Sequence, residues 1–257
     1  MAEPMPCVIL AGGKAKPDLQ ALTGQENRAL VVVQGKRMLD TAVEAVRTSG
    51  RIGSVAVVGD VPESGDYARL EDQGSFVGNV FAGARYFTDS PYLLFATSDL
   101  PFLTGESVAH FVEEALKRGE ESQAALLYPI ISVARCYERF PGVKRTSLKL
   151  REGVFTGGNL MLVRPRILAA QQARVAEAYA ARKSPLRLAT MLGMGTVIRL
   201  LLSQTLSPNL LTIPFLEMGV SRVLGAEARA VICEDVEIAT DLDRPSDFEA
   251  LGIIASK

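Results

Sequence analysis

The sequence predicts an α/β fold in which a mostly parallel sheet is covered by helices on both faces, giving three layers. Two observations carry this prediction. Short apolar, β-branched runs alternate with longer amphipathic runs along the chain, which is the pattern of strands and helices in parallel sheets. One apolar run ends in a turn with glycines and lysines, and another ends in a turn with a carboxylate. Ligands of such sheets bind beyond the carboxyl ends of the strands, where these turns would lie.

The predicted strands are short, mostly apolar runs, as expected for strands buried on both faces of a parallel sheet. They are Pro6–Leu10, Ser54–Gly59, Tyr92–Thr97, Ala124–Ile131, Gly158–Val163 and Ala228–Cys233.

Two of the intervening segments have apolar residues at helical spacing. Arg37–Ser49 is followed by Gly50, and Ser107–Arg118 is followed by Gly119. Because glycine commonly follows the last turn of a helix, we expect each helix to end there. Near the C-terminus, Asp243 is expected to cap a short helix that Pro245 begins and Gly252 ends.

Residues 166–224 differ from the rest because they lack convincing strands. They are expected to form several helices interrupted by Pro185, Pro208 and Pro214. We therefore expect a single domain over residues 1–257, with a helical insertion at about 166–224 beside the sheet.

The composition is that of an ordinary globular protein, with 48% hydrophobic and 22% charged residues and a formal net charge of -1. This charge gives no basic footprint for nucleic acid. No apolar run approaches the ~20 residues needed to span a bilayer, and no signal-peptide pattern is evident. The cysteines Cys7, Cys136 and Cys233 are far apart, which favours buried reduced thiols in a cytoplasmic protein. With the charge and the apolar runs, this predicts no nucleic-acid or membrane partner.

The first predicted strand leads into two glycines and two lysines. Glycines allow the backbone to approach a ligand closely, and successive N–H groups in such a turn bind anions. Arg28 could reach the same phosphate region or pair with Glu26 at the surface. The candidate phosphate-binding residues of this turn are Ala11, Gly12, Gly13, Lys14 and Lys16.

Asp99 follows the strand Tyr92–Thr97 and is the first candidate ligand for Mg²⁺, which prefers carboxylate and phosphate oxygens. The alternative is a plain capping role at the end of the strand. Asp243 is a second candidate ligand, with a helix-capping role as its alternative, and Asp241 is a third.

Two further glycine-containing turns could contact ligands. Gly74–Asn79 is suited to a base or ribose, or is simply the entry to a helix. Thr156–Asn159 offers backbone N–H groups and an amide, or is simply the turn before a strand. The only histidine, His110, lies in the middle of a predicted helix, so hydrolase chemistry that needs a Ser/His/Asp set is disfavoured.

In this order and spacing, the segments resemble nucleotidyltransferases of the molybdenum cofactor guanylyltransferase type, which have the Rossmann-like nucleotide-diphospho-sugar transferase fold, also called GT-A type. The resemblance rests on Leu10–Gly13, Asn27–Leu30, Gly35–Leu39, Gly74–Ala82, Ser98–Leu103, Thr156–Asn159 and Asp241–Asp247.

The resemblance implies a Mg²⁺-dependent enzyme that transfers a nucleoside monophosphate from a nucleoside triphosphate to a small phosphorylated acceptor, releasing pyrophosphate. It implies catalytic roles for Lys14, Arg28 and Asp99, and metal binding by Asp99 and Asp243. The implied acceptor-binding residues are Gly157, Gly158 and Asn159. The implied nucleotide-binding residues are Leu10, Ala11, Gly12, Gly13, Lys14, Lys16, Arg28, Gly74, Asn79 and Ser98.

Two departures from the family pattern keep alternatives open. Lys14–Pro17 stands where the family has a small residue and then an arginine, and Arg28 stands where it has a lysine. The alternatives are a sugar-1-phosphate or phospholactate nucleotidyltransferase and a catalytically silent nucleotide-binding protein of the same fold. A glycosyltransferase that uses Asp241–Asp243 as an Asp-x-Asp metal motif is a third.

Overall fold

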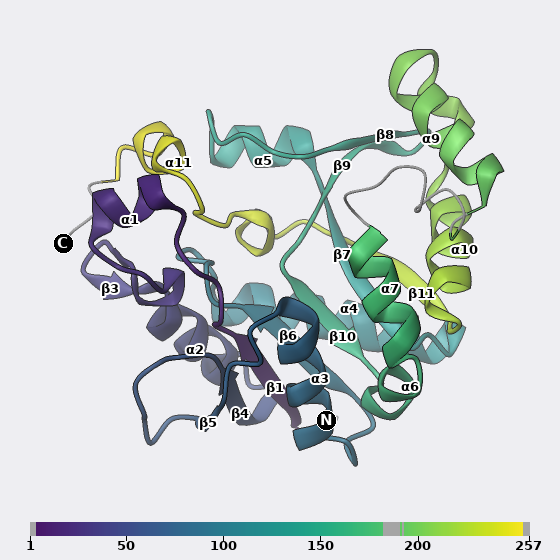
Figure 1. The fold of residues 1–257 in the computed structure, drawn as a ribbon. Coiled ribbons are helices and arrows are strands. Elements are labelled where there is room, and N and C mark those ends of the chain that lie inside the picture. The colour runs from purple at the N-terminus through teal and green to yellow at the C-terminus, as the bar shows by residue number, and fades with distance from the viewer. Residues whose placement is uncertain (1–3, 182–190, 192, 254–257) are drawn as a thin grey trace.

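A central sheet organises the molecule, seen in a computed structural model that describes residues 4–181, 191 and 193–253 (Figure 1). In this part of the chain nine strands form the main sheet, ordered β5-β4-β1-β6-β10-β7-β9-β8, with β11 pairing with β7. Their bounds are β1 Met5–Leu10, β4 Ile52–Val58, β5 Ala68–Leu70, β6 Leu93–Thr97, β7 Leu126–Ser132, β8 Leu148–Leu150, β9 Gly153–Gly157, β10 Leu160–Val163 and β11 Ala228–Cys233.

The sheet is mixed but mostly parallel. β1 is parallel to both β4 and β6, β4 is parallel to β5, and β7 is parallel to β11. β10 is antiparallel to its neighbours β6 and β7, and β9 is antiparallel to β7 and β8. The predicted α/β class is confirmed. The predicted strands lie within three residues of the observed ones, while β5, β8 and β9 were not predicted.

Helices cover both faces of the sheet because side chains of a buried strand alternate between the faces. On one face, Cys7 and Ile9 pack with α2 (Met38–Thr48) and α4 (Gly105–Ser122) in the largest hydrophobic cluster. On the other face, Val8 and Leu10 pack with α3 (Phe76–Tyr86). The three-layer prediction is therefore confirmed.

One helix end was predicted wrongly. Gly119 lies inside α4, which continues to Ser122 and ends at Gln123 in the left-handed conformation. A Cβ atom at Gly119 would lie 3.1 Å from the Tyr92 hydroxyl oxygen and 3.2 Å from Leu127. This glycine therefore serves a close helix–sheet contact and not a helix end. Gly50, with a φ of 67°, does follow the end of α2 as expected.

Helices occupy the described residues between β10 and β11. They are α6 Pro165–Ala170, α7 Gln172–Ala181, α9 Met194–Thr205, the 3-10 helix η2 Pro208–Leu210, and α10 Ile213–Leu224. Pro208 and Pro214 lie in first turns, where proline is tolerated, so they begin helical segments. Pro185 lies outside the described residues. None of the described helices is long and apolar enough to cross a bilayer.

The remaining elements are short. They are α1 Pro17–Thr23, η1 Arg28–Leu30, β2 Val32–Val33, β3 Lys36–Arg37, α5 Val133–Arg139, η3 Val236–Ala239 and α11 Pro245–Ala250. α1 and α11, which lie near opposite ends of the chain, are side by side (Figure 1). They are joined by an apolar cluster in which Leu19 packs with Leu242 and Phe248. This cluster brings the loops before both helices to the same edge of the sheet.

Candidate active site

The glycine turn and Asp99 lie at the same edge of the sheet. β1 and β6 are neighbouring parallel strands, with Leu10 opposite Thr97. The Ser98 N–H donates to the carbonyl oxygen of Leu10 at 3.2 Å, so the turn after β6 begins against the end of β1. Ser98 and Asp99 are both buried.

The glycine turn is held by backbone contacts on two sides. The Ala11 N–H donates to Val58 at 2.8 Å, and the Arg28 N–H donates to Gly13 at 2.9 Å. The Asn27 amide donates to the carbonyl oxygens of Ala11 at 3.0 Å and Asp60 at 2.8 Å. Because backbone groups are fixed in this way, the turn is pre-organised before any ligand binds.

Both glycines are needed for close packing around the turn. A Cβ atom at Gly12 would lie 2.4 Å from the Asn79 Nδ2 atom, and one at Gly13 would lie 2.8 Å from the Arg28 Nη2 atom. An added Cβ at Gly12 would therefore require the Asn79 side chain to shift, and one at Gly13 would require the Arg28 side chain to shift.

Arg28 joins the two candidate carboxylates. Its Nη2 atom lies 3.1 Å from the Asp99 Oδ2 atom, and its Nη1 atom lies 3.9 Å from the Asp243 Oδ2 atom. Lys16 lies 2.6 Å from the same Asp243 oxygen. The Leu242 N–H donates to the main-chain oxygen of Asp99 at 3.2 Å, which fixes the C-terminal segment beside β6.

Asp243 does not cap α11 as predicted. The helix begins at Pro245 after Arg244, and the Asp247 carboxylate accepts the N–H groups of Asp243 at 3.3 Å and Arg244 at 3.1 Å. With the turn held by Asp247, the Asp243 side chain points instead to Lys16 and Arg28. Its predicted capping alternative is wrong for this physical reason.

Asp241 is a third carboxylate at this edge. Burial raises its pKa, as do the negative charges of Asp99 and Asp243, while Arg28 opposes the shift. The Asn159 amide donates to Asp241 at 3.4 Å, and the Asn159 N–H donates to the carbonyl oxygen of Ile238 at 2.9 Å. Asn159 therefore links the turn between β9 and β10 to the carboxylate segment.

The residues fit a magnesium ion. The Asp99 side chain is 6% exposed, and its Oδ1 atom is buried with no hydrogen-bond partner among the described residues. A buried carboxylate oxygen without a donor is the atom type that Mg²⁺ takes as a ligand. Among the described residues no three acidic, histidine or cysteine side chains are already spaced around a metal position. Mg²⁺ usually needs only one or two carboxylates, the rest being phosphate oxygens and water.

Two other predicted nucleotide-binding residues, Lys14 and Asn79, differ in their contacts. Lys14 is exposed, pairs with Asn27 in an isolated β-bridge, and makes no ion pair with the described residues. Both polar atoms of Asn79 are engaged, since it accepts from the Gln73 N–H at 2.7 Å and donates to Asp72 at 2.9 Å. Asn79 thus holds the loop that contains Gly74.

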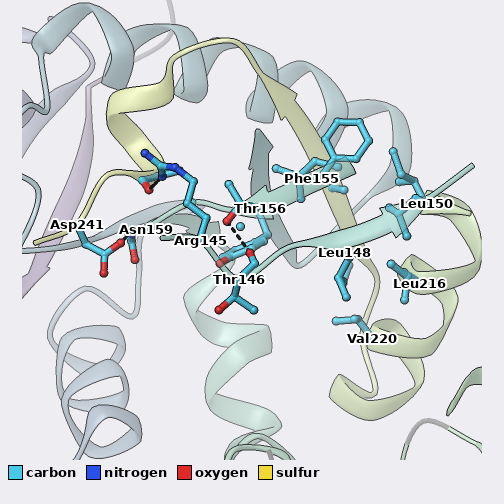
Figure 2. Close-up of a pocket in the computed structure, with 18 of the residues that line it drawn as sticks. Arg145, Thr146, Leu148, Leu150, Phe155, Thr156, Asn159, Leu216, Val220 and Asp241 are labelled. Atoms are coloured by element: carbon cyan, nitrogen blue, oxygen red, sulfur yellow. Dashed lines mark hydrogen bonds between the residues drawn. The ribbon is translucent and has the colours of Figure 1, made fainter. Parts of the chain in front are cut away.

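A pocket of about 660 Å³ adjoins the carboxylates Asp241 and Asp243 on the side of the turn between β9 and β10. The predicted acceptor residues Gly157, Gly158 and Asn159 line it together with Asp241 and Asp243. In Figure 2, Asp241, Asn159 and Arg145 lie at one end, and Phe155, Leu148 and Leu216 lie at the other.

Sequence reasoning missed most of this pocket's walls. Arg145 donates to the Ala239 carbonyl oxygen and, at 2.9 Å, to the Thr240 hydroxyl. Lys144, Arg145 and Thr146 also line the pocket. The available signal was two adjacent cations before a threonine, ten residues ahead of the Thr156–Asn159 turn.

Comparisons with known proteins found one family model and several similar structures. The family model "MobA-like NTP transferase domain" matches residues 7–187. A hypothetical transferase structure from Thermus thermophilus is 32% identical, with a TM-score of 0.83, covering 95% of this chain and 99% of the other. No curated protein sequence matches the chain.

Two more distant structures share the fold alone. A 2-C-methyl-D-erythritol 4-phosphate cytidylyltransferase, also from Thermus thermophilus, is 15% identical, with a TM-score of 0.53 and 95% of each chain covered. A CMP:2-keto-3-deoxy-manno-octonic acid synthetase, solved with CTP, is 11% identical, with a TM-score of 0.61 and 96% of each chain covered.

Proposed function

Since the chain belongs to the family of MobA-like NTP transferases, and is thus a transferase enzyme, we propose the reaction that it catalyses. A nucleoside monophosphate passes from a nucleoside triphosphate to a small phosphorylated acceptor, and pyrophosphate is released in a Mg²⁺-dependent step. The observation that carries the proposal is the pairing of Arg28 with Asp99 and Asp243 beside the glycine turn. The fold neighbour solved with CTP supports the nucleotide side of the proposal.

The triphosphate binds over the glycine turn. Its oxygens accept hydrogen bonds from the N–H groups of Gly12 and Gly13. Positive charge comes from Lys14, Lys16 and Arg28. In the described structure Lys16 and Arg28 are neutralised by Asp243 and Asp99. When phosphate arrives, these cations turn to it and leave the carboxylates without partners.

Asp99 and Asp243 would then hold Mg²⁺, which when bound neutralises charge on the phosphates. Asp99 is fixed for this task by burial and by the hydrogen bond from Leu242 to its main-chain oxygen. Such fixed groups lower the barrier because they need not reorganise during the reaction.

The acceptor enters from the pocket on the Asn159 side. An oxygen of its phosphate attacks the α-phosphorus in line, one P–O bond forms, and the bond to the β-phosphate oxygen breaks to release pyrophosphate. A phosphate nucleophile is already ionised near neutral pH, so no general base is needed. Positioning and charge neutralisation are the work left to the protein.

Thermal unfolding in the presence of each nucleoside triphosphate tests the donor half of the proposal. A ligand that binds only the native state raises the Tm, so one of ATP, GTP, CTP and UTP should raise it more with Mg²⁺ than with EDTA. In Asp99→Asn the Mg²⁺-dependent part of this rise should disappear. No shift with any of the four nucleotides would refute the proposal.

Pyrophosphate release on addition of phosphate monoesters tests the transfer half. Release that depends on triphosphate, acceptor and Mg²⁺ together is expected. Nucleotide binding without release for any acceptor would instead favour a silent nucleotide-binding protein, the alternative that the altered Lys14–Pro17 segment raises.

A further inference from the structure

The pocket beside the carboxylates is divided into a polar end and an apolar end (Figure 2). Asp241, Asn159 and Arg145 stand at the polar end. The apolar end lies between the β8–β9 pair and α10. Its main walls are Leu148, Leu150, Phe155, Leu216 and Val220.

The apolar end is open to solvent although its walls are hydrophobic. Leu148 is 36% exposed and Val220 is 38% exposed, and both line a concave surface. A volume of about 660 Å³ is within the range of small-molecule sites. Exposed apolar side chains gathered in a concave pocket favour an apolar ligand group.

The charged groups at the apolar end are already engaged. Glu217 is buried, and its carboxylate accepts a hydrogen bond from the Ala230 N–H at 2.8 Å. The same carboxylate lies 3.9 Å from the Arg229 guanidinium and 3.7 Å from the Arg118 guanidinium. Arg229 also pairs with Glu227 at 2.6 Å. These groups bind one another, so they offer little to the hydroxyls of a sugar.

The polar end keeps a cation for an anionic group. Lys144 lines the pocket and makes no ion pair with the described residues. The neighbouring Arg145 is held by Ala239 and Thr240. A phosphate at this end would lie beside the carboxylate segment where the proposed transfer takes place.

We infer that the acceptor is a phosphate monoester with an extended apolar body. Its phosphate lies at the Lys144 end, and its hydrocarbon part lies between Leu148 of β8 and Val220 of α10. This inference rests on the proposed function and narrows its acceptor to an amphipathic molecule. A sugar phosphate would place hydroxyls against leucine, valine and phenylalanine, which offer them no hydrogen-bond partner and bury hydrocarbon more favourably.

Direct binding of alkyl phosphates tests the inference without requiring turnover. Calorimetry measures the affinity for methyl, butyl and hexyl phosphate and for glucose 1-phosphate. Along the alkyl series, the affinity should rise by about fourfold for each buried methylene group. Glucose 1-phosphate should bind more weakly than hexyl phosphate. Equal affinity along the alkyl series, or tighter binding of glucose 1-phosphate, would overturn the inference.

Variants separate the two ends of the pocket. Leu148→Ser and Val220→Ser should weaken hexyl phosphate binding by about tenfold or more while leaving methyl phosphate unchanged. Lys144→Ala should weaken every alkyl phosphate by the same factor. Leu201→Ser, at a 62% exposed position of α9 outside the pocket walls, is the matched control and should change neither. Unchanged hexyl phosphate affinity in both serine variants would contradict the assigned place of the apolar body.

The same ligands distinguish failure of the inference from failure of the proposed function. If hexyl phosphate binds as described but no nucleotide raises the Tm, the transfer reaction is wrong and the apolar pocket stands. If nucleotides bind and glucose 1-phosphate supports pyrophosphate release with a lower KM than hexyl phosphate, the reaction stands and the apolar acceptor is wrong.

Discussion

Asp99 combines burial, one arginine partner and one oxygen that accepts no hydrogen bond within the described part of the chain. A buried carboxylate is costly unless its charge is compensated. In this site the compensation is shared between a protein cation and, in the proposed reaction, a metal ion. Substitution of Asp99 should therefore affect activity, and substitution of its partner Arg28 should affect stability.

Replacing Asp99 by asparagine keeps the shape of the side chain and removes its charge. Loss of metal-assisted charge neutralisation should lower kcat/KM by at least about 100-fold, measured by pyrophosphate release. Asp89→Asn, at an exposed carboxylate paired with Arg166, is the control and should retain activity. A fully active Asp99→Asn would remove Asp99 from the site.

Replacing Arg28 by alanine leaves Asp99 buried without its cation. The free energy of unfolding in EDTA should fall by about 3 kcal/mol, the usual cost of breaking a buried pair from one side. Mg²⁺ should restore more stability to this variant than to the wild type, because the metal supplies the missing positive charge. Chemical denaturation with and without Mg²⁺ measures both effects.

The matched control for Arg28→Ala is Arg47→Ala. Arg47 pairs with Asp66, but both side chains are more than half exposed, so its loss should cost at most about 1 kcal/mol and show no Mg²⁺ dependence. An Arg28→Ala variant that behaves like Arg47→Ala would show that Asp99 is not electrostatically dependent on Arg28.

At the scale of elements, the glycine turn depends on the end of the neighbouring strand β4. Gly59 has a φ of 157°, and a Cβ atom there would lie 2.6 Å from the carbonyl carbon of Ala11. Because the obstacle is backbone, it cannot swing aside as a flexible side chain would. The geometry of the glycine turn is thus set partly by Gly59, a residue outside that turn.

Gly59→Ala should therefore lower the free energy of unfolding by about 2 kcal/mol or more and raise the KM for nucleotide. Gly65→Ala is the matched control, since no atom lies within 4 Å of its added Cβ and its φ is ordinary. Denaturant titration and nucleotide-dependent Tm shifts would report both. Equal stability of the two variants would show that the β4 end does not constrain the turn.

How far the elements could be predicted follows from their size. Apolar or amphipathic runs such as β1, α2 and β11 carry their own sequence signal, and their bounds were predicted to within one residue at each end. β8 has three residues, Leu148–Leu150, of which only Leu150 is buried. Its strand conformation comes from pairing with β9, and such a tertiary cause leaves little pattern in a short segment.

The site was predictable where a motif marks a strand end. The meeting of Gly12 and Gly13 with Asp99 was predicted, because the carboxyl ends of parallel strands share one edge. For Arg28 the sequence left open a surface pair with Glu26, and the structure pairs it with Asp99 instead. The apolar pocket was not, since its walls come from β8, β9 and α10, and only their packing shows that Leu148 faces Val220. The roles assigned to these residues stay predictions, as does one domain over residues 1–257 with an insertion at 166–224.

At the scale of the whole molecule, the three cysteines are buried and free. Burial raises the pKa of the Cys233 thiol from 9.0 to about 12, with the charges of Asp235 and Glu114 adding to the effect. Burial also raises the pKa of Cys7 and Cys136. The native protein therefore keeps thiol protons that the unfolded chain loses.

The stability of the protein should then fall as the pH rises above about 9. Between the unfolded pKa of 9.0 and the native pKa of about 12, the unfolded state binds fewer protons than the native state, which favours unfolding. Cys233 should contribute a slope of about 1.4 kcal/mol per pH unit in this window. Urea denaturation of the wild type and Cys233→Ala at pH 8 to 11 measures it, and identical slopes would contradict the prediction.

The order of strands in the sheet has a consequence for divergence within the family. The glycine turn lies on the β4, β1 and β6 side of the sheet, whereas the apolar pocket walls come from β8, β9 and α10. Mutations that reshape one side leave the other side's backbone hydrogen bonds in place. Under the proposed function, a lineage can thus acquire a new acceptor by exchanging a few leucine and valine positions, without rebuilding the turn proposed to bind the triphosphate.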